Sequence, residues 1–117
     1  MEILGSSLRV VVDELEPAIG VYERLTGEQA LRFDRSGVSV AAVGCFLLMS
    51  GPQATVEVLR KIHATLAVKD VDEALLALHD VGAEIIAGPS PTPIGRNLVA
   101  RHPDGSIFEY VDRRPDA

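Results

Sequence analysis

The chain has 117 residues, 47% of them hydrophobic and 24% charged, which is typical of one globular domain with its own core and not of a disordered protein. The net charge of −6 at pH 7, without a basic cluster, disfavours nucleic acid as a partner. No apolar run approaches the roughly 20 residues that span a bilayer, so we expect a cytoplasmic protein without a membrane partner.

The first half of the chain predicts one strand, one helix and then three shorter strands. Residues 8–12 form an apolar run typical of a strand. The helix after it begins near Pro17, which suits a first helical turn, and ends at Gly27. Apolar residues recur between them at helical spacing, at Leu15, Ala18, Ile19, Tyr22 and Leu25. The strand candidates that follow are residues 30–33, 38–43 and 46–50.

The single cysteine, Cys45, lies beside the last of these strand candidates. One cysteine excludes an internal disulfide framework and a cysteine-based zinc site. Because free cysteines in apolar strands are usually small core residues, we predict that Cys45 is buried and is not a nucleophile.

The second half repeats this order, beginning near residue 62. Residues 63–68 show the alternation of a strand. Asp70 followed by Glu73 resembles the capping box at the start of a helix, and Gly82 suits the position after its end.

A β-hairpin is predicted near the end of the chain. Two apolar-rich runs, residues 97–102 and 106–111, flank Pro103-Asp104-Gly105, where the glycine supplies the positive φ of a tight turn. Ahead of the hairpin, residues 88–96 are rich in proline and glycine, so we predict a flexible loop that covers a site.

The two halves align with each other, which indicates two copies of one supersecondary unit. Ser7 aligns with His63 at an offset of 56 residues, and Leu48 aligns with Glu109 at an offset of 61. Both halves then have the order β-α-β-β-β, which predicts an α+β fold.

The predicted domain covers residues 1–117 and contains two βαβββ modules, at residues 6–51 and 62–112. Residues 52–61 would connect the modules, and residues 54–60 fit either a short helix or a strand.

Three stretches of the chain carry motifs of a known superfamily. Residues 13–27, DELEPAIGVYERLTG, are similar to a helix that ends in FY and LG. Residues 63–75, HATLAVKDVDEAL, and 102–112, HPDGSIFEYVD, are similar to the motifs H-x-x-x-x-V-x-D-V and D-P-D-G followed by a glutamate. The chain thus resembles the vicinal oxygen chelate superfamily, which includes glyoxalase I, the bleomycin-resistance-type binding proteins and the extradiol dioxygenases. The resemblance implies two βαβββ modules whose sheets curl around a shared cleft, commonly in a homodimer.

The resemblance also implies where a metal would bind. Family metal ligands come from the first and last strands of each module, which here correspond to Ser7, Leu48, His63 and Glu109. Only His63 and Glu109 are of a ligand type, whereas a divalent metal in this fold needs three or four protein ligands. We therefore expect no complete metal site and no cofactor, with a divalent metal on His63 and Glu109 as the alternative. A ligand role for His102 also stays open.

Two interpretations of His63 and Glu109 follow. Glu109 shares its strand face with apolar neighbours, so a buried carboxylate there needs a partner. In the first interpretation, the two residues form a hydrogen-bonded pair left from an ancestral site. In the second, Glu109 is a general base and His63 is a proton donor or an orienting group.

Six further residues are candidates for ligand contacts. Arg9 shares a strand face with Ser7, where its guanidinium could hold a carboxylate, a phosphate or an enolate, or could lie in water. Arg96 and Arg101 border the loop and the hairpin, and Phe46 would give the cleft an aromatic wall. The candidates are Ser7, Arg9, Phe46, Leu48, Arg96 and Arg101.

Three functions are compatible with these features. The leading hypothesis is a glyoxalase-like or bleomycin-resistance-like protein that binds a small molecule between its sheets. The competing hypothesis is a lyase, isomerase or dioxygenase that uses His63 and Glu109, with or without a metal. The third is a structural partner domain, and in each case we expect a homodimer.

Overall fold

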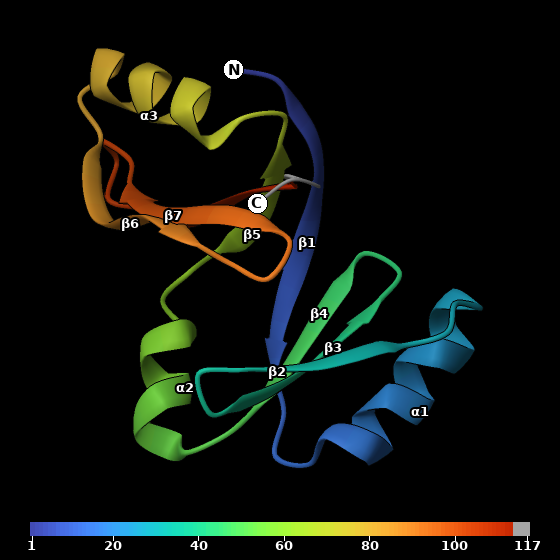
Figure 1. Ribbon diagram of the computed structural model, residues 1–117. Coiled ribbons are helices and arrows are strands. Elements are labelled where there is room, and N and C mark those ends of the chain that lie inside the picture. Colours follow the sequence, from blue (N-terminus) through green and yellow to red (C-terminus); the bar gives the residue numbers. More distant parts are fainter. Residues whose placement is uncertain (114–117) are drawn as a thin grey trace. The chain divides into compact units, whose positions relative to one another are not determined.

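The structure is a computed structural model that describes residues 1–113. Its elements in chain order are β1 (Ile3–Val11), α1 (Leu15–Thr26), β2 (Leu31–Arg35), β3 (Val38–Val43), β4 (Phe46–Ser50), α2 (Gln53–Leu59), β5 (Ala64–Val68), α3 (Val71–Asp80), β6 (Glu84–Pro91), β7 (Gly95–Arg101) and β8 (Ile107–Arg113) (Figure 1). The chain divides into two compact units. The first unit is Ser7–Lys61, and the second joins Met1–Ser6 to the chain from Ile62 onward.

Both units have the same strand arrangement, which confirms the predicted α+β class and the order βαβββ. In the first unit the strands lie in the order β2-β3-β4-β1, and in the second they lie in the order β6-β7-β8-β5. The first strand of each unit pairs in parallel with the last, β1 with β4 and β5 with β8. The remaining pairs are antiparallel hairpin neighbours, as short connections require.

Helix α1 covers one face of the first unit's sheet. Gly27 ends this helix with a left-handed φ of 72°, as its position in the sequence predicted. Ile19 packs into a core cluster that contains Ala41, Val43 and Leu48. The opposite face has its own apolar cluster, formed by Val38, Val40 and Met49 and joined by Val11, Leu47 and the α2 residue Leu59.

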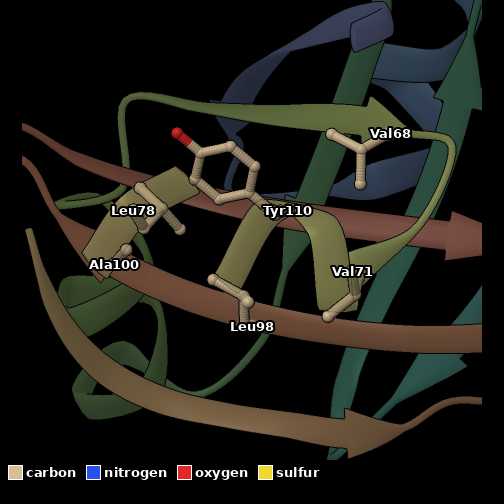
Figure 2. Close-up of a cluster of buried hydrophobic side chains, with 7 residues drawn as sticks. Val68, Val71, Leu78, Leu98, Ala100 and Tyr110 are labelled. Carbon is tan, nitrogen blue, oxygen red and sulfur yellow. The ribbon is translucent and has the colours of Figure 1, made fainter. Parts of the chain in front are cut away.

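Helix α3 covers one face of the second unit's sheet. Asp70 caps this helix by accepting a hydrogen bond from the Asp72 backbone N–H, and Gly82 follows it with a φ of 79°, so both predicted ends are confirmed. The Tyr110 ring lies among the α3 side chains in Figure 2. The buried residues of this core are Val68, Val71, Ala74, Leu78, Leu98, Ala100 and Tyr110.

The predicted β-hairpin is confirmed as β7 and β8, with its turn at Pro103-Asp104-Gly105. The predicted flexible loop at residues 88–96 is wrong, because most of it belongs to β6 and β7 and only residues 92–94 lie between these strands. Pro89 and Pro91 are tolerated since β6 is at the sheet edge, where a missing N–H breaks no inner ladder.

Two further expectations are settled by local structure. Residues 53–59 of the connector form the helix α2, which resolves the choice between helix and strand. The prediction that Cys45 is buried is wrong, because Cys45 lies exposed in the turn between β3 and β4. Among the helices of residues 1–113, none is both long and apolar enough to span a membrane.

Candidate functional site

The pairing of β1 with β4 changes which residues share a face with Ser7 and Arg9. Arg9 lies opposite Leu47, and Val10 lies opposite Leu48. Thr65 lies opposite Glu109 in the second unit, so the residue of the first unit that corresponds to Glu109 is Leu47, at an offset of 62. The predicted offset of 61 was therefore wrong by one residue. A one-residue slip exchanges the two faces of a strand.

Leu48 and Phe46 consequently lie on the α1 side of the sheet, not on the side of Ser7. Leu48 is 0% exposed and packs in the cluster around Ile19. The Phe46 ring lies 4.7 Å from the Tyr22 ring, centroid to centroid. The predicted ligand contacts of Leu48 and Phe46 are wrong, because both side chains pack in the core beneath α1.

Glu109 is held by two neutral side chains from neighbouring strands. The Thr65 hydroxyl donates to Oε1 at 2.9 Å, and Asn97 Nδ2 donates to Oε2 at 3.0 Å. Glu109 is only 7% exposed and Thr65 only 8%. A buried carboxylate needs such donors, because burial without hydrogen bonds costs several kcal/mol.

Strand register brings these three side chains to one face of the sheet. Thr65 on β5 is the direct partner of Glu109 on β8. Asn97 on β7 pairs with Val111, two residues beyond Glu109, so its side chain points to the same face. Tyr110 packs against α3 on the opposite face. We call Thr65, Asn97 and Glu109 the polar face.

Thr65 and Asn97 are not among the site residues predicted from the sequence. The position of Asn97 could have been predicted from the hairpin. A turn at residues 103–105 sets Val99 opposite Glu109, and Asn97, two residues before Val99, has its side chain on the same face of the sheet. The signal for Thr65 was its place two residues after His63 on one alternating strand.

His63 is not bonded to Glu109 within the described part of the chain, so the predicted hydrogen-bonded pair is wrong. The His63 Nδ1 atom lies 3.2 Å from both the backbone N and the backbone O of Ile107. The His63 ring stacks on Phe108, with 5.5 Å between centroids. Because His63 is exposed and precedes β5, its ring can turn to the end of the sheet, away from the carboxylate.

These donors do not fit the ligand set of a divalent metal. No group of three or more His, Cys, Asp or Glu side chains that could hold a metal ion occurs within residues 1–113. Three or four protein ligands are the usual minimum for such an ion. Correcting the register replaces Leu48 by Leu47 at the second of the four family positions, and Leu47 is equally unable to ligate.

Arg96, a candidate for ligand contact, lies in an ion-pair network at the start of α3. Its guanidinium nitrogens lie 3.0 Å from Asp72 and 3.4 Å from Asp70. Asp112, only 3% exposed, accepts hydrogen bonds from the backbone N–H groups of Val71 and Arg96, each at 2.8 Å. This carboxylate therefore joins α3 to β7, a role that was not predicted from the sequence.

The other basic candidate of the second unit, Arg101, lies at the sheet edge. Its guanidinium lies 3.0 Å from Glu84 on β6, and both side chains are largely exposed. Ser7 and Arg9 are half-buried on β1, on the face opposite α1. Ligand contacts by Ser7, Arg9, Arg96 and Arg101 stay predictions.

A shallow hollow runs along the outer side of α1. Its lining residues are Pro17, Gly20, Val21, Arg24 and Leu25. It holds no converging set of polar groups of the kind that orients a bound small molecule, so we do not assign the site there.

His102 is packed into an aromatic cluster at the end of the hairpin. Its ring stacks on Phe108 with 4.6 Å between centroids, and its Nε2 lies 2.6 Å from the Tyr110 hydroxyl. Burial raises the pKa of the Tyr110 hydroxyl above its ordinary value of 10.0.

Ionisation of Tyr110 should therefore lower the free energy of unfolding at alkaline pH. A phenol whose pKa is higher in the folded than in the unfolded state stabilises fully below about pH 10, and this contribution is lost as pH rises through the folded pKa. In Tyr110→Phe we expect the free energy of unfolding to fall less steeply as the pH rises above about 10, measured by urea denaturation. An unchanged slope in Tyr110→Phe would contradict this assignment.

Comparison with known proteins identifies proteins that are similar to this chain. The chain is 39% identical to an uncharacterized protein from Methanosarcina mazei, over 97% of this chain and 95% of that one, with a TM-score of 0.92. The two proteins belong to one family. No protein-family model matches the chain, and no curated protein matches it.

Solved structures of lower sequence identity show that this fold is shared with methylmalonyl-CoA epimerases. The epimerase from Mycobacterium tuberculosis has a TM-score of 0.77 at 18% identity, covering 97% of this chain and 91% of that one. A variant of the Streptomyces coelicolor epimerase, in complex with 2-nitronate-propionyl-CoA, has a TM-score of 0.74 at 16% identity, covering 97% and 95%. The family therefore has a fold of the vicinal oxygen chelate type.

Proposed function

We propose that this protein is a member of the vicinal oxygen chelate superfamily that binds a small organic ligand at the polar face, without a resident metal. The observation that carries the proposal is the buried Glu109 carboxylate, fixed by Thr65 and Asn97 on the sheet face opposite α3. A few fixed polar groups on an otherwise apolar surface are what orient a small ligand. The fold supports the same conclusion, since an epimerase with this fold binds a coenzyme A derivative.

The polar face has the apolar surroundings that such a site requires. Val99 and Val111 flank Glu109 on the same face, and Ala67 is the partner of Val111 on β5. All three are half-buried. Apolar atoms around one carboxylate would bind the body of the ligand by burial, while Glu109 fixes its polar group.

We expect Glu109→Gln to weaken ligand binding at least about tenfold, because a hydrogen bond to a charged group contributes about 1.5–3 kcal/mol. Ligands are found by thermal shift with a panel of neutral, cationic and anionic compounds that includes a coenzyme A thioester. Isothermal titration calorimetry then measures the affinity of each hit. Glu84→Gln is the matched control, because it makes the same change at an exposed glutamate.

Two outcomes would contradict the proposal. Hits that bind Glu109→Gln as tightly as wild type would place the ligand elsewhere on the chain. Affinity that is lost on dialysis against EDTA and restored by Zn²⁺ or Mn²⁺ would show that a metal completes the site. Binding that withstands EDTA and fails in Glu109→Gln is the expected result.

A second candidate function is proton transfer at a carbon atom, which the similarity to methylmalonyl-CoA epimerases favours. Epimerisation requires a base that removes a proton and an acid that returns one, and Glu109 is a carboxylate held in a fixed orientation. The test is incorporation of deuterium into methylmalonyl-CoA in D₂O, followed by NMR. Exchange that depends on Glu109 would establish an enzyme; binding without exchange would leave the binding function.

A further inference from the structure

We propose that the outer edge of β2 is an interface at which two copies of this protein pair, with Phe33 of one copy opposite Phe33 of the other. β2 is the first strand in the order of the sheet, and within residues 1–113 it pairs with β3 alone. Antiparallel pairing of two such edges about a two-fold axis would join the two sheets into one. The interface lies in the first unit and uses no residue of the polar face.

The β2 edge is exposed and lacks two features that commonly keep a sheet edge from pairing. Leu31 is 68% exposed and Phe33 is 43% exposed. All five residues of β2 pair with β3 in regular register, and none of them is a proline. The edge strand of the second unit differs, because β6 contains Pro89, Pro91 and two register shifts. Prolines and bulges hinder further pairing, and β2 has neither.

The turn between β2 and β3 determines which backbone groups of β2 point outward. Residues 36–37 form a two-residue turn, with φ values of 52° and 81°. The residues that flank such a turn exchange backbone hydrogen bonds, and the exchange recurs at every second residue. Arg35 and Phe33 therefore bond to β3. The backbone groups of Arg32 and Asp34 point outward, where a second strand can bond to them.

The charges on this edge select one register. A two-fold axis can pass through Arg32, Phe33 or Asp34. An axis through Arg32 sets two guanidinium groups opposite each other, and an axis through Asp34 sets two carboxylates opposite each other. An axis through Phe33 sets each Arg32 opposite Asp34 of the second copy. Because like charges in opposite positions destabilise a strand pair and unlike charges stabilise it, the edge is complementary to itself about Phe33.

The same register brings the exposed aromatic side chains together. Phe33 would form a pair without backbone hydrogen bonds, the kind in which opposing side chains lie closest. Cross-strand aromatic pairs are favourable. The Phe33 ring shares its face with Val40, the partner of Phe33 on β3 and part of the apolar cluster opposite α1. Pairing would therefore extend an existing apolar surface.

Arg32 can hold the carboxylate of the second copy while keeping its present partner. Its Nε and Nη2 atoms donate to the two carboxylate oxygens of Glu16, each at 2.9 Å. The Nη1 atom is outside this pair, and Arg32 is exposed at the edge. A guanidinium has enough donors for two carboxylates. Asp34 is exposed on the same face of β2, since it lies two residues from Arg32.

Charge reversal tests the interface by sedimentation velocity of the full chain at micromolar concentration. Arg32→Asp leaves two carboxylates on the edge, and Asp34→Arg leaves two guanidinium groups. We expect wild type to be a dimer and each variant alone to dimerise at least about tenfold more weakly. An equal mixture of the two variants should regain the dimer, because unlike charges then meet. Arg60→Asp, at an exposed arginine after α2, is the matched control and should leave the dimer intact.

A disulfide test examines the register itself. Cys45 is exposed, so it is first replaced by serine. In this background, Phe33→Cys would place two thiols opposite each other, at a Cα separation that a disulfide accepts. We expect oxidation by diamide to give a covalent dimer on a non-reducing gel. Leu76→Cys, at an exposed position on α3, is the control and should stay largely unlinked.

Three results would overturn the proposal. The first is a wild-type chain that stays monomeric up to its solubility limit. The second is a dimer that survives unchanged in both Arg32→Asp and Asp34→Arg, or two variants that are folded by circular dichroism yet do not recombine. The third is cross-linking through Phe33→Cys that is no faster than through Leu76→Cys.

Discussion

Asp112→Ala is expected to lower the free energy of unfolding by about 3 kcal/mol. The substitution removes the acceptor for two backbone N–H groups, those of Val71 and Arg96, which would remain at a buried position. It also removes one of the carboxylates around the Arg96 guanidinium. The start of α3 and the strand β7 would lose their common anchor.

Urea denaturation monitored by circular dichroism measures this effect, and the melting temperature should fall by roughly 12 °C for a domain of this size. Asp112→Asn keeps one acceptor oxygen, so we expect a smaller loss. Asp80→Ala is the control, because Asp80 is exposed at the other end of α3. A loss below about 1 kcal/mol in Asp112→Ala would mean that water replaces the carboxylate at both amides.

Leu48→Ala should cost about 3 kcal/mol, and Leu47→Ala clearly less. Leu48 is 0% exposed beneath α1, so truncation leaves a cavity among Ile19 and its neighbours. Leu47, on the other face of β4, is half-buried and loses less contact. Leu47 and Leu48 are neighbouring leucines on opposite faces of β4. Both variants are therefore compared with wild type in one series of urea denaturation curves. Equal losses, or a larger one at Leu47, would contradict the register of β4.

The order of elements could be predicted from the sequence because local signals specify it. Gly27 and Gly82 end their helices with positive φ, Asp70 caps α3, and the Pro103-Asp104-Gly105 turn sets the final hairpin. Each of these signals lies within a few residues of the feature that it determines. The repeat then gave the βαβββ order of both units.

The faces of β4 could not be predicted in the same way. Phe46, Leu47, Leu48 and Met49 are all apolar, because this strand is packed on both sides, beneath α1 and against the cluster of Val38 and Val40. A run of four consecutive apolar residues lacks the alternation that shows which residue faces which side. The one-residue error followed from this, and it moved Leu48 and Phe46 into the predicted site.

The candidate site was predictable only for Glu109, a charge among apolar neighbours on one strand. Its partners, Thr65 and Asn97, come from two other strands and depend on pairing that a single strand does not specify. Asp112 was missed for a related reason, since in the sequence it is followed directly by two arginines and has the composition of a polar tail. Only the register with β7 shows it to be buried.

The division of the chain has a consequence for its synthesis. The unit Ser7–Lys61 is one continuous stretch, so it can be completed as soon as Lys61 has left the ribosome. Met1–Ser6 belong instead to the unit that begins again at Ile62, and the Glu2 carbonyl accepts a hydrogen bond from the Lys69 N–H at 3.1 Å. These six residues can therefore join their unit only after the part of the chain that begins at Ile62 has been synthesised. A fusion partner placed before Met1 would accordingly disturb the late-folding unit and spare the early one.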